Sequence, residues 1–413
     1  MKILIKGGRV IDPASQIDAV KDVMINEGKP EKIIDATGKI VIPGLVDMHV
    51  HLREPGREDK ETVLTGTRAA IKGGVTAVLA MPNTTPAIDF PENAALLKDI
   101  IKKTACCNVY ICGAITQGRL GEKLSPIAAL KKSGALAISD DGNSVDNPEI
   151  LLKALKAAKA NNLLLICHCE DKILSAGGVV NLGIVSTRLG LKGISNAAEY
   201  TRIKRDIDLA AKVKLPIHIA HVSCKESVEI IAAAKKKGIA VTAETAPHYF
   251  ALTEEAALEY DTNMKINPPL RSKEDVAAIK QGLKNGVIDC IASDHAPHTE
   301  NEKDIEFDRA EFGSIGLETS LAISITELVK TGILTWGQLV EKMACNPAKI
   351  LKINKGTLAK GRDADVVIVD PHKEWVLKRE EIVSKSQNSA FIGRRLTGKV
   401  EYAICAGKIV YQA

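Results

Sequence analysis

Histidines and aspartates recur in this sequence directly after short apolar runs. The earliest case is His49-Val-His51, which closes an apolar run that starts at Ile40. In a β-strand, residues i and i+2 point to the same face, so these two imidazoles project together. Two imidazoles on one face can bind a zinc ion, and the guanidinium of Arg53, just beyond them, can hold an anionic substrate. By itself, the pair fits a metal site as well as it fits two polar residues at a strand end.

Eight apolar runs alternate with amphipathic segments and would position these residues. The runs are 40–46, 75–80, 109–113, 135–138, 163–166, 216–220, 239–243 and 287–292, and helical patterns such as 92–103, 148–160, 227–237 and 273–284 lie between them. This alternation is typical of parallel βαβ architecture, and eight units over about 300 residues is the size of a TIM barrel. A doubly wound open sheet is the alternative, but no glycine-rich phosphate-binding motif follows the first strand. We therefore predict a (β/α)8 barrel over residues 43–353.

The two ends of the chain have a different texture. Residues 1–42 and 354–413 contain short β runs bounded by Gly, Pro, Asp or Lys. Neither piece has enough apolar surface to fold alone. We expect them to form one small β-sandwich domain together, beside the barrel.

Composition excludes several classes of protein. The formal net charge of +5 comes from charges spread along the whole chain, without a basic stripe interleaved with aromatics, so no nucleic-acid partner is expected. No apolar run approaches the roughly 20 residues that span a bilayer, so no membrane association is expected. The nine cysteines form no CxxC pair and several lie in apolar runs. They indicate reduced, buried side chains in a cytoplasmic protein.

The residues that follow the predicted strands are the candidate site residues, because active sites of TIM barrels lie at the carboxyl ends of the strands. They are His49, His51, Asn83, Asp141, His168, His221 and Asp294. Four imidazoles and two carboxylates exceed what one zinc ion needs and favour a binuclear centre. Parity along the strands turns His218 and His295 away from this set. Structural packing is the better interpretation of His248, and His372 is expected on the surface.

Ten stretches of the sequence together carry a resemblance to a known family. Two of them are Pro43-Gly-Leu-Val-Asp-Met-His-Val-His-Leu-Arg53 and Ala292-Ser-Asp-His-Ala-Pro-His298; the others are 81–86, 139–142, 167–170, 220–223, 244–249, 265–271, 312–319 and 346–348. In this order they resemble the amidohydrolase superfamily and, within it, the class I dihydroorotases of bacteria. Any one stretch is a weak signal, whereas ten in order across nearly the whole chain are specific.

The resemblance implies an enzyme of de novo pyrimidine (UMP) biosynthesis. The reaction would be the reversible hydrolysis of (S)-dihydroorotate to N-carbamoyl-L-aspartate by a zinc-bound hydroxide. It also implies these roles: His49 and His51 bind a first zinc with Asp294 close by, His168 and His221 bind a second zinc, and Asp141 bridges. Asp294 would be the catalytic proton carrier. One or two zinc ions per chain are expected, with two favoured.

The substrate contacts that the resemblance implies are His51, Arg53, Asn83, Asn267, His298, Phe312 and Gly313. Arg53 can form a bidentate pair with a carboxylate. From the sequence alone, Asn83 and Asn267 are better explained as turn residues close to prolines. Only the resemblance places them in the site.

Other functions remain open at this point. A related cyclic-amide hydrolase, such as an allantoinase or dihydropyrimidinase, would keep the histidines but would not need Arg53 and Asn83 to bind a carboxylate. Hydantoinases bridge their metals with a carboxylated lysine after the fourth strand, where this chain has Asp141. A non-catalytic subunit would have lost metal ligands, and none is missing. The resemblance also leaves room for a homodimer and for association with aspartate transcarbamoylase.

Overall fold

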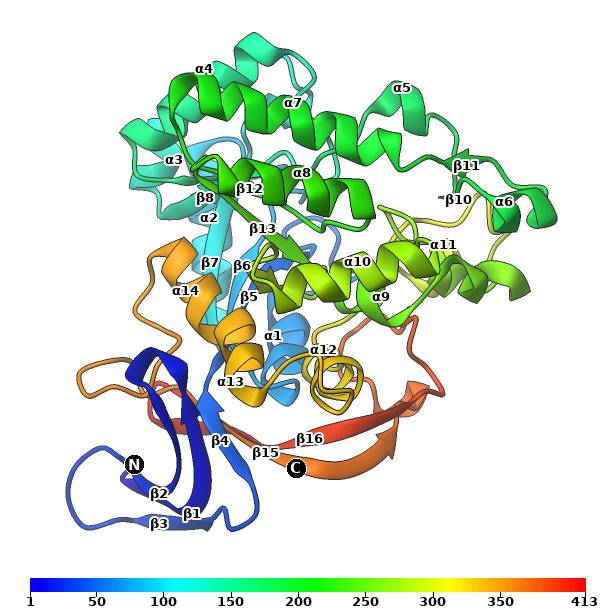
Figure 1. Cartoon of the computed structure of the whole chain (residues 1–413). Helices are drawn as coiled ribbons and strands as arrows, with labels where there is room; N and C mark the ends of the chain where they lie inside the picture. The colour runs from blue at the N-terminus through cyan, green and yellow to red at the C-terminus, as the bar shows by residue number, and fades with distance from the viewer.

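The computed structural model of this chain describes residues 1–413. At its centre lies an eight-stranded sheet in the order β14-β13-β12-β9-β8-β7-β6-β5, in which every pair is parallel (Figure 1). The strands are β5 (Leu45–Val50), β6 (Val75–Ala80), β7 (Asn108–Gly113), β8 (Ala135–Ile138), β9 (Leu164–Cys167), β12 (Ile217–Ile219), β13 (Val241–Thr245) and β14 (Cys290–Ile291). Beyond β14, His295 pairs with Val50, and its carbonyl accepts a 2.9 Å hydrogen bond from the His51 N–H. The first and last strands therefore meet, and the predicted barrel is confirmed.

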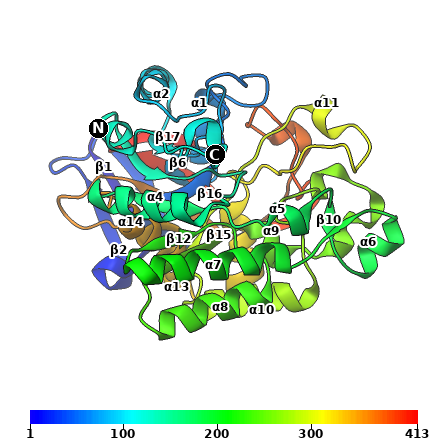
Figure 2. The same ribbon diagram turned by 90° about the horizontal axis from the view of Figure 1, so that it is seen from above.

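Helices surround this sheet on its outer side. They are α1 (Val63–Lys72), α2 (Pro91–Thr104), α3 (Ile127–Lys132), α4 (Pro148–Ala160), α7 (Ala197–Val213), α8 (Lys225–Lys236), α10 (Lys273–Lys284) and α12 (Ser320–Ser324). The chain also forms the short helices α9 (Pro247–Ala251), α11 (Glu300–Lys303), α13 (Trp336–Val340) and α14 (Asn346–Leu351). Figure 2 shows α7, α8 and α10 side by side along one side of the barrel. Local sequence signals mark where some of these helices begin. Asn147 caps α4 ahead of Pro148, and Ser272 forms a capping box with Asp275 at the start of α10.

The barrel interior is filled by small and medium apolar side chains. They are Val46, Met48, Ala77, Leu79, Met81, Cys112, Ala137, Ile166, Ala220, Cys290 and Ala292, together with Ala348 and Leu351 of α14. α14 packs at the amino ends of the strands, where Ile350 and the strand residue Leu164 both pack against this interior cluster.

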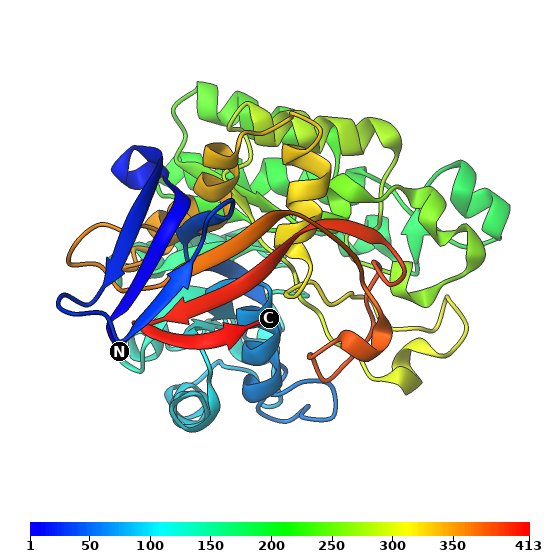
Figure 3. The same ribbon diagram turned by 90° about the horizontal axis from the view of Figure 1, so that it is seen from below.

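Both termini build a second, seven-stranded sheet, which Figure 3 shows from below. Its strands are β1 (Ile3–Asp12), β2 (Ile17–Ile25), β3 (Lys32–Asp35), β4 (Ile40–Pro43), β15 (Val366–Val376), β16 (Arg395–Cys405) and β17 (Lys408–Gln412). The two ends of the chain join where β4 pairs antiparallel with β15, with Val41 opposite Ile368. The expectation that the termini share one β unit is confirmed.

One predicted strand was wrong. The run 40–46 is not a single barrel strand, because the chain leaves the terminal sheet at Pro43 and enters the barrel at Leu45. Gly44 makes this crossing possible: its N–H donates to the Asp365 carbonyl at 2.9 Å, and a Cβ there would lie 2.1 Å from Thr76 Oγ1. Both halves are buried, so continuous hydrophobicity could not reveal the change of sheet.

A long excursion follows β9 before the next full helix. It contains α5 (Lys172–Ser175), α6 (Ile184–Leu189) and a two-stranded parallel sheet of β10 (Val180–Asn181) and β11 (Gly193–Ile194). The buried guanidinium of Arg271 anchors it by donating to Asn181 Oδ1 at 2.9 Å and to the Ile194 carbonyl at 3.0 Å. Among all the helices, none is long and apolar enough to cross a membrane.

Candidate metal centre

The predicted metal residues converge at the carboxyl end of the barrel. They are His49 on β5 and His51 just beyond it, Asp141 after β8, His168 after β9, His221 after β12 and Asp294 after β14. All six side chains are buried. Parallel strands deliver them to one place because their carboxyl ends share one rim.

Asp141 lies between two groups of ligand atoms. The ligand atoms of His49, His51 and Asp141 lie within 4.8 Å of one another, and so do those of Asp141, His168 and His221. Asp141 Oδ1 is 3.3 Å from His49 Nε2 and 3.5 Å from His168 Nδ1. Asp294 Oδ1 is 3.2 Å from His51 Nε2. The arrangement offers two three-residue metal sites that share one carboxylate.

Each of three imidazoles uses its other ring nitrogen to contact a side chain outside the metal set. His49 Nδ1 lies 2.6 Å from Glu244 Oε1, and His51 Nδ1 lies 2.8 Å from Asn83 Oδ1. Such partners fix the tautomer and the orientation of a ligand histidine.

The third contact involves His168, whose Nε2 lies 3.2 Å from Glu170 Oε2. Glu170 also accepts a hydrogen bond from Asn267 Nδ2 at 3.2 Å. Glu244 and Glu170 are not among the predicted site residues. Both lie in stretches that carry the family resemblance, 167–170 and 244–249, at or just after a strand end.

The donor set fits a cation. Burial would lower the pKa of His49, but the charges of Asp141 and Glu244 raise it well above its usual value, so the metal-free imidazole is protonated. Its Nε2 lies 3.3 Å from Asp141 Oδ1, and neither of these buried atoms has a hydrogen-bond partner. Two facing lone pairs repel unless a proton or a metal ion lies between them. His168 Nδ1 and His221 Nε2 likewise lie 2.8 Å apart. Imidazole and carboxylate are ligands that zinc prefers.

The pKa values of His168 and Asp294 also indicate that this site favours positive charge. Burial would lower the pKa of His168, but hydrogen bonds with Asp141 and Glu170 raise it to about 9. Burial would raise the pKa of Asp294, but the hydrogen bond with His51 and the charge of His49 hold it well below its usual range. Asp294 is therefore ionised at neutral pH.

Three residues of the site adopt left-handed backbone conformations that non-glycine residues rarely occupy. They are Arg53 (φ 61°), His221 (φ 32°) and Asp294 (φ 48°). Asp47 supports Asp294 from below, because its carboxylate accepts from the N–H of Ser293 at 3.0 Å and from that of His49 at 3.2 Å. Such strain persists only where the surroundings fix the backbone, and it is concentrated at functional sites.

Arg53 and His298 form a polar wall beside the metal residues. Arg53 Nε donates to the Pro297 carbonyl at 3.1 Å, and Nη2 lies 3.3 Å from His298 Nε2. On its far side, His298 Nδ1 lies 3.1 Å from Nζ of the buried Lys60. Burial and the charges of Arg53 and Lys60 lower the pKa of His298 to about 2, so its imidazole is neutral.

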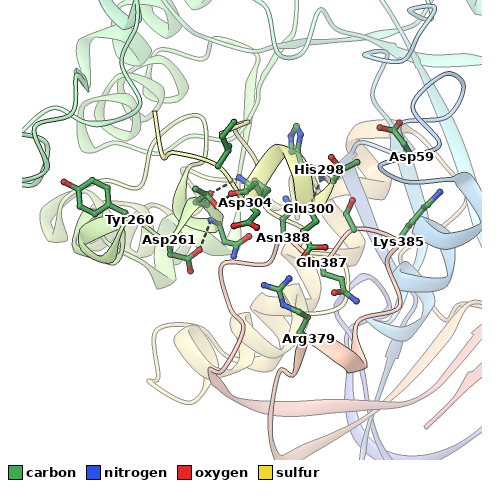
Figure 4. A pocket seen from close by; sticks show the side chains of 16 residues that line it. Asp59, Tyr260, Asp261, His298, Glu300, Asp304, Arg379, Lys385, Gln387 and Asn388 are labelled. Atoms are coloured by element: carbon green, nitrogen blue, oxygen red, sulfur yellow. Dashed lines mark hydrogen bonds between the residues drawn. The ribbon is translucent and has the colours of Figure 1, made fainter. Parts of the chain in front are cut away.

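His298 also lines a polar cleft of about 660 Å³, which Figure 4 shows from close by. The cleft lies among the loop that carries Asp59, the segment 260–263, α11 and the segment 385–388. Of the predicted substrate residues, His298 alone is among those that line this cleft.

The remaining predicted substrate residues approach the same wall. The Gly313 N–H donates to the Lys265 carbonyl at 2.9 Å, which joins the segment of Phe312 and Gly313 to that of Asn267. A Cβ on Gly313 (φ 143°) would lie 2.7 Å from Ala296 Cβ and 3.1 Å from His298 Cδ2. Only glycine allows this close approach. Phe312 itself packs under the ammonium of Lys265, 4.6 Å from its ring centre.

Three histidines outside the predicted set are also buried, and two of them, His218 and His295, lie away from the metal residues as parity predicts. His218 Nδ1 bonds Thr242 Oγ1 at 2.8 Å, and its Nε2 lies 3.3 Å from Glu244 Oε2, so it packs behind His49. His295 contacts Glu61 Oε2 at 3.2 Å on the outer side of the strand. His248 is buried and its pKa falls to about 4, chiefly through burial.

The chain is similar in sequence to known proteins over its full length. A family model described as "Dihydro-orotase-like" matches residues 38–227. A dihydroorotase from Elusimicrobium minutum is 54% identical over 420 residues, covering 99% of this chain and 97% of that protein. A dihydroorotase from Geobacter metallireducens is 50% identical over 427 residues and covers 100% of both chains.

Among solved structures, an L-hydantoinase (dihydropyrimidinase) from Arthrobacter aurescens superposes with a TM-score of 0.89 at 25% identity, covering 99% of this chain and 96% of that one. The fold is thus shared with hydantoinases, whereas the full-length sequence matches at about half identity are dihydroorotases. The chain belongs to the dihydroorotase family of the amidohydrolase superfamily.

Proposed function

We propose that this chain is a zinc-dependent dihydroorotase, which interconverts (S)-dihydroorotate and N-carbamoyl-L-aspartate in pyrimidine biosynthesis. The observation that carries the proposal is the pair of three-residue ligand groups sharing Asp141, beside a wall that contains Arg53. Full-length similarity to dihydroorotases supports it.

His49, His51 and Asp141 would hold one zinc ion, and Asp141, His168 and His221 would hold a second. Bound zinc would supply a Lewis acid and lower the pKa of a water molecule. The protein's own part is to fix the donors, which Glu244, Asn83 and Glu170 do through the second ring nitrogens.

Asp294 is the proton carrier in this proposal. It is ionised, and its Oδ1 lies 3.2 Å from His51 Nε2, at the edge of the first ligand group. An ionised carboxylate there can accept a proton from the attacking water and deliver it to the leaving ring nitrogen.

The substrate carboxylate would bind to Arg53, with Asn83 and His298 as further partners. Asn83 Oδ1 is engaged by His51, which leaves Asn83 Nδ2 as a donor. The neutral His298 can hydrogen-bond without bringing a second charge. Asn267 and the backbone of Phe312 and Gly313 would contact the pyrimidine ring.

A cyclic-amide hydrolase for uncharged rings is the second candidate, and the likeness to the hydantoinase fold favours it. Two features weigh against it. Asp141 occupies the position where a carboxylated lysine bridges the metals of hydantoinases, and Arg53 provides a cation that an uncharged ring does not need. We also propose that the chain has two structural units. Residues 43–353 form the barrel, and residues 1–42 and 354–413 together form the terminal sheet.

The experiment that tests the function is turnover of dihydroorotate, hydantoin and allantoin by the zinc-loaded protein. Hydrolysis of dihydroorotate alone is the expected result. Faster hydrolysis of hydantoin or allantoin would overturn the proposal, and no turnover of any would favour a non-catalytic subunit.

We also propose how the protein assembles and where in the cell it is located. A homodimer and association with aspartate transcarbamoylase follow from the family resemblance alone, so mass measurement with and without that enzyme tests them. We propose a cytoplasmic location because the nine cysteines are free, as is usual in a reducing compartment.

A further inference from the structure

His298 lies between two cations, neither of which can accept a hydrogen bond. Its Nδ1 is 3.1 Å from Nζ of Lys60, and its Nε2 is 3.3 Å from Nη2 of Arg53. Ammonium and guanidinium groups have donors only, and a neutral imidazole carries one proton on one of its two nitrogens. The tautomer of His298 therefore decides which of the two contacts is a hydrogen bond.

Lys60 is held firmly behind the imidazole. Its side chain is buried, and its Nζ pairs with Glu302 Oε1 at 2.9 Å. Its backbone is held as well, because its carbonyl accepts from Ser386 Oγ at 2.6 Å. A buried donor without an acceptor costs free energy, and Nδ1 of His298 is an acceptor at normal hydrogen-bond distance. The unprotonated nitrogen of His298 is therefore Nδ1, and the proton lies on Nε2.

The other tautomer has no comparable partner. A proton on Nδ1 would face the ammonium of Lys60, and the nearest carboxylate oxygen, Glu302 Oε2, is 3.6 Å away, which is too far for a hydrogen bond. That oxygen already accepts from the N–H and from Oγ of Thr299, both at 3.0 Å. The surroundings of Nδ1 therefore favour its lone pair.

The ring itself is held in one orientation. The backbone N–H of His298 donates to Asn388 Oδ1 at 3.0 Å, and Asn388 Nδ2 donates to the carbonyls of Ala296 and Gly313, both at 3.1 Å. Cδ2 of the ring faces Gly313, where a Cβ would lie 3.1 Å from it. A ring turned by half a rotation would place this carbon against the ammonium of Lys60 instead of a nitrogen.

With the proton on Nε2, two donors face each other on the open side of the ring. Nη2 of Arg53 is 3.3 Å away, and its guanidinium is held in place because Nε donates to the Pro297 carbonyl at 3.1 Å. Two N–H groups at this distance repel unless an acceptor oxygen binds to both of them. A carboxylate can accept from both, and the charge of Arg53 strengthens its binding.

We infer that Lys60 fixes the Nε2–H tautomer of His298 and thereby makes His298 a hydrogen-bond donor to the substrate carboxylate, beside Arg53. This inference rests on the proposed function. Lys60 is then a positioning residue, because it acts through His298 from the side of the ring opposite Arg53.

The tautomer can be measured by NMR of the zinc-loaded protein with isotope-labelled histidine. Protonated and unprotonated ring nitrogens have separate chemical shifts, and His298→Ala identifies the signals of His298 among those of the nine histidines. The wild type is expected to carry the proton on Nε2. Lys60→Met should move it to Nδ1, since Nε2 can then accept from Arg53, whereas Lys60→Arg keeps a donor and should keep the wild-type tautomer. A wild type protonated on Nδ1 would overturn the inference even if Lys60→Met did not fold.

Steady-state kinetics measure the effect on the substrate. Lys60→Met is expected to raise KM for dihydroorotate about tenfold, as for loss of a hydrogen bond to a charged group, with kcat changed less than about twofold. Lys60→Arg should restore KM to within about threefold of the wild type, because it restores a donor to Nδ1. Lys98→Met, on the exposed side of α2, is the matched control and should change neither constant.

A double-mutant cycle separates positioning from simple attraction between Lys60 and an anion. If Lys60 acts through His298, Lys60→Met in the His298→Ala background should change KM less than about twofold. The full tenfold change in that background, or an unchanged tautomer and KM in Lys60→Met alone, would overturn the inference. If the wild type failed to hydrolyse dihydroorotate, the proposed function would fail, while the NMR measurement would still test whether Lys60 fixes the tautomer.

Discussion

Replacing Glu244 by glutamine is expected to weaken zinc binding while leaving every ligand in place. Glu244 Oε1 lies 2.6 Å from His49 Nδ1, and both side chains are at most 1% exposed, so water does not screen the contact. The His49 and His218 contacts hold the pKa of Glu244 at about 2 against the effect of burial, so it is ionised. Glutamine keeps an acceptor oxygen but loses the charge.

The magnitude follows from this geometry. Charge-assisted hydrogen bonds are roughly twice as strong as neutral ones, and loss of such an outer partner typically costs about 10- to 100-fold in metal affinity. That range corresponds to about 1.4–2.7 kcal/mol. Competition with a chromophoric chelator measures the affinity, and Glu229→Gln, on the exposed face of α8, is the matched control. An affinity for Glu244→Gln within twofold of the wild type would refute the assigned role of the Glu244–His49 contact.

Three further predictions concern charge, substrate and fold. Because the pKa of His168 is raised to about 9 without metal, the metal-free protein carries a proton that zinc must displace, so affinity should rise with pH up to about 9. Calorimetry in buffers of different ionisation enthalpy would detect the released proton, and a flat affinity between pH 6 and 8 would contradict it. Arg53→Lys should raise KM for dihydroorotate about tenfold or more, since lysine cannot form the bidentate pair; steady-state kinetics would show an unchanged KM if Arg53 were only structural. Gly44→Ala should lower the free energy of unfolding by about 1–3 kcal/mol, because its Cβ would lie 2.1 Å from Thr76 Oγ1; chemical denaturation measures this, and an unchanged midpoint would refute the packing argument.

Much of the barrel was predictable because its signals are local. The helices α4 and α10 begin and end at the predicted residues, since Asn147-Pro148 and Ser272 with Asp275 mark their starts in the sequence. The strand β6 also has the predicted bounds, because six apolar or small residues stand between a glycine pair and a proline turn.

The strand predictions that were wrong depend on contacts between residues far apart in the sequence. Gly44 lies between the two sheets. Glycine is needed there because Thr76 and Asp365, which lie far along the chain, contact its backbone closely. The final barrel strand β14 is only Cys290–Ile291, shorter than the predicted 287–292, because much of that run lies outside the regular pairing with β13.

In the site, too, local signals predicted some residues, while residues that depend on distant contacts were missed. Parity and strand ends could gather the ligand residues, because each depends on a few neighbouring positions. The partners that orient them could not be predicted in this way: Glu244 is 195 residues from His49, and Lys60 is 238 residues from His298. Their roles depend on contacts that only the closed barrel creates.

The central claim is that Asp141 is shared by two metal ions. The most direct test is zinc content per chain, measured together with dihydroorotate turnover, for the wild type and Asp141→Ala. The account predicts about two zinc ions for the wild type, and for Asp141→Ala a loss of at least one ion with turnover reduced by a factor of about 100 or more. Zinc content and turnover that remain unchanged in a folded Asp141→Ala protein would contradict it.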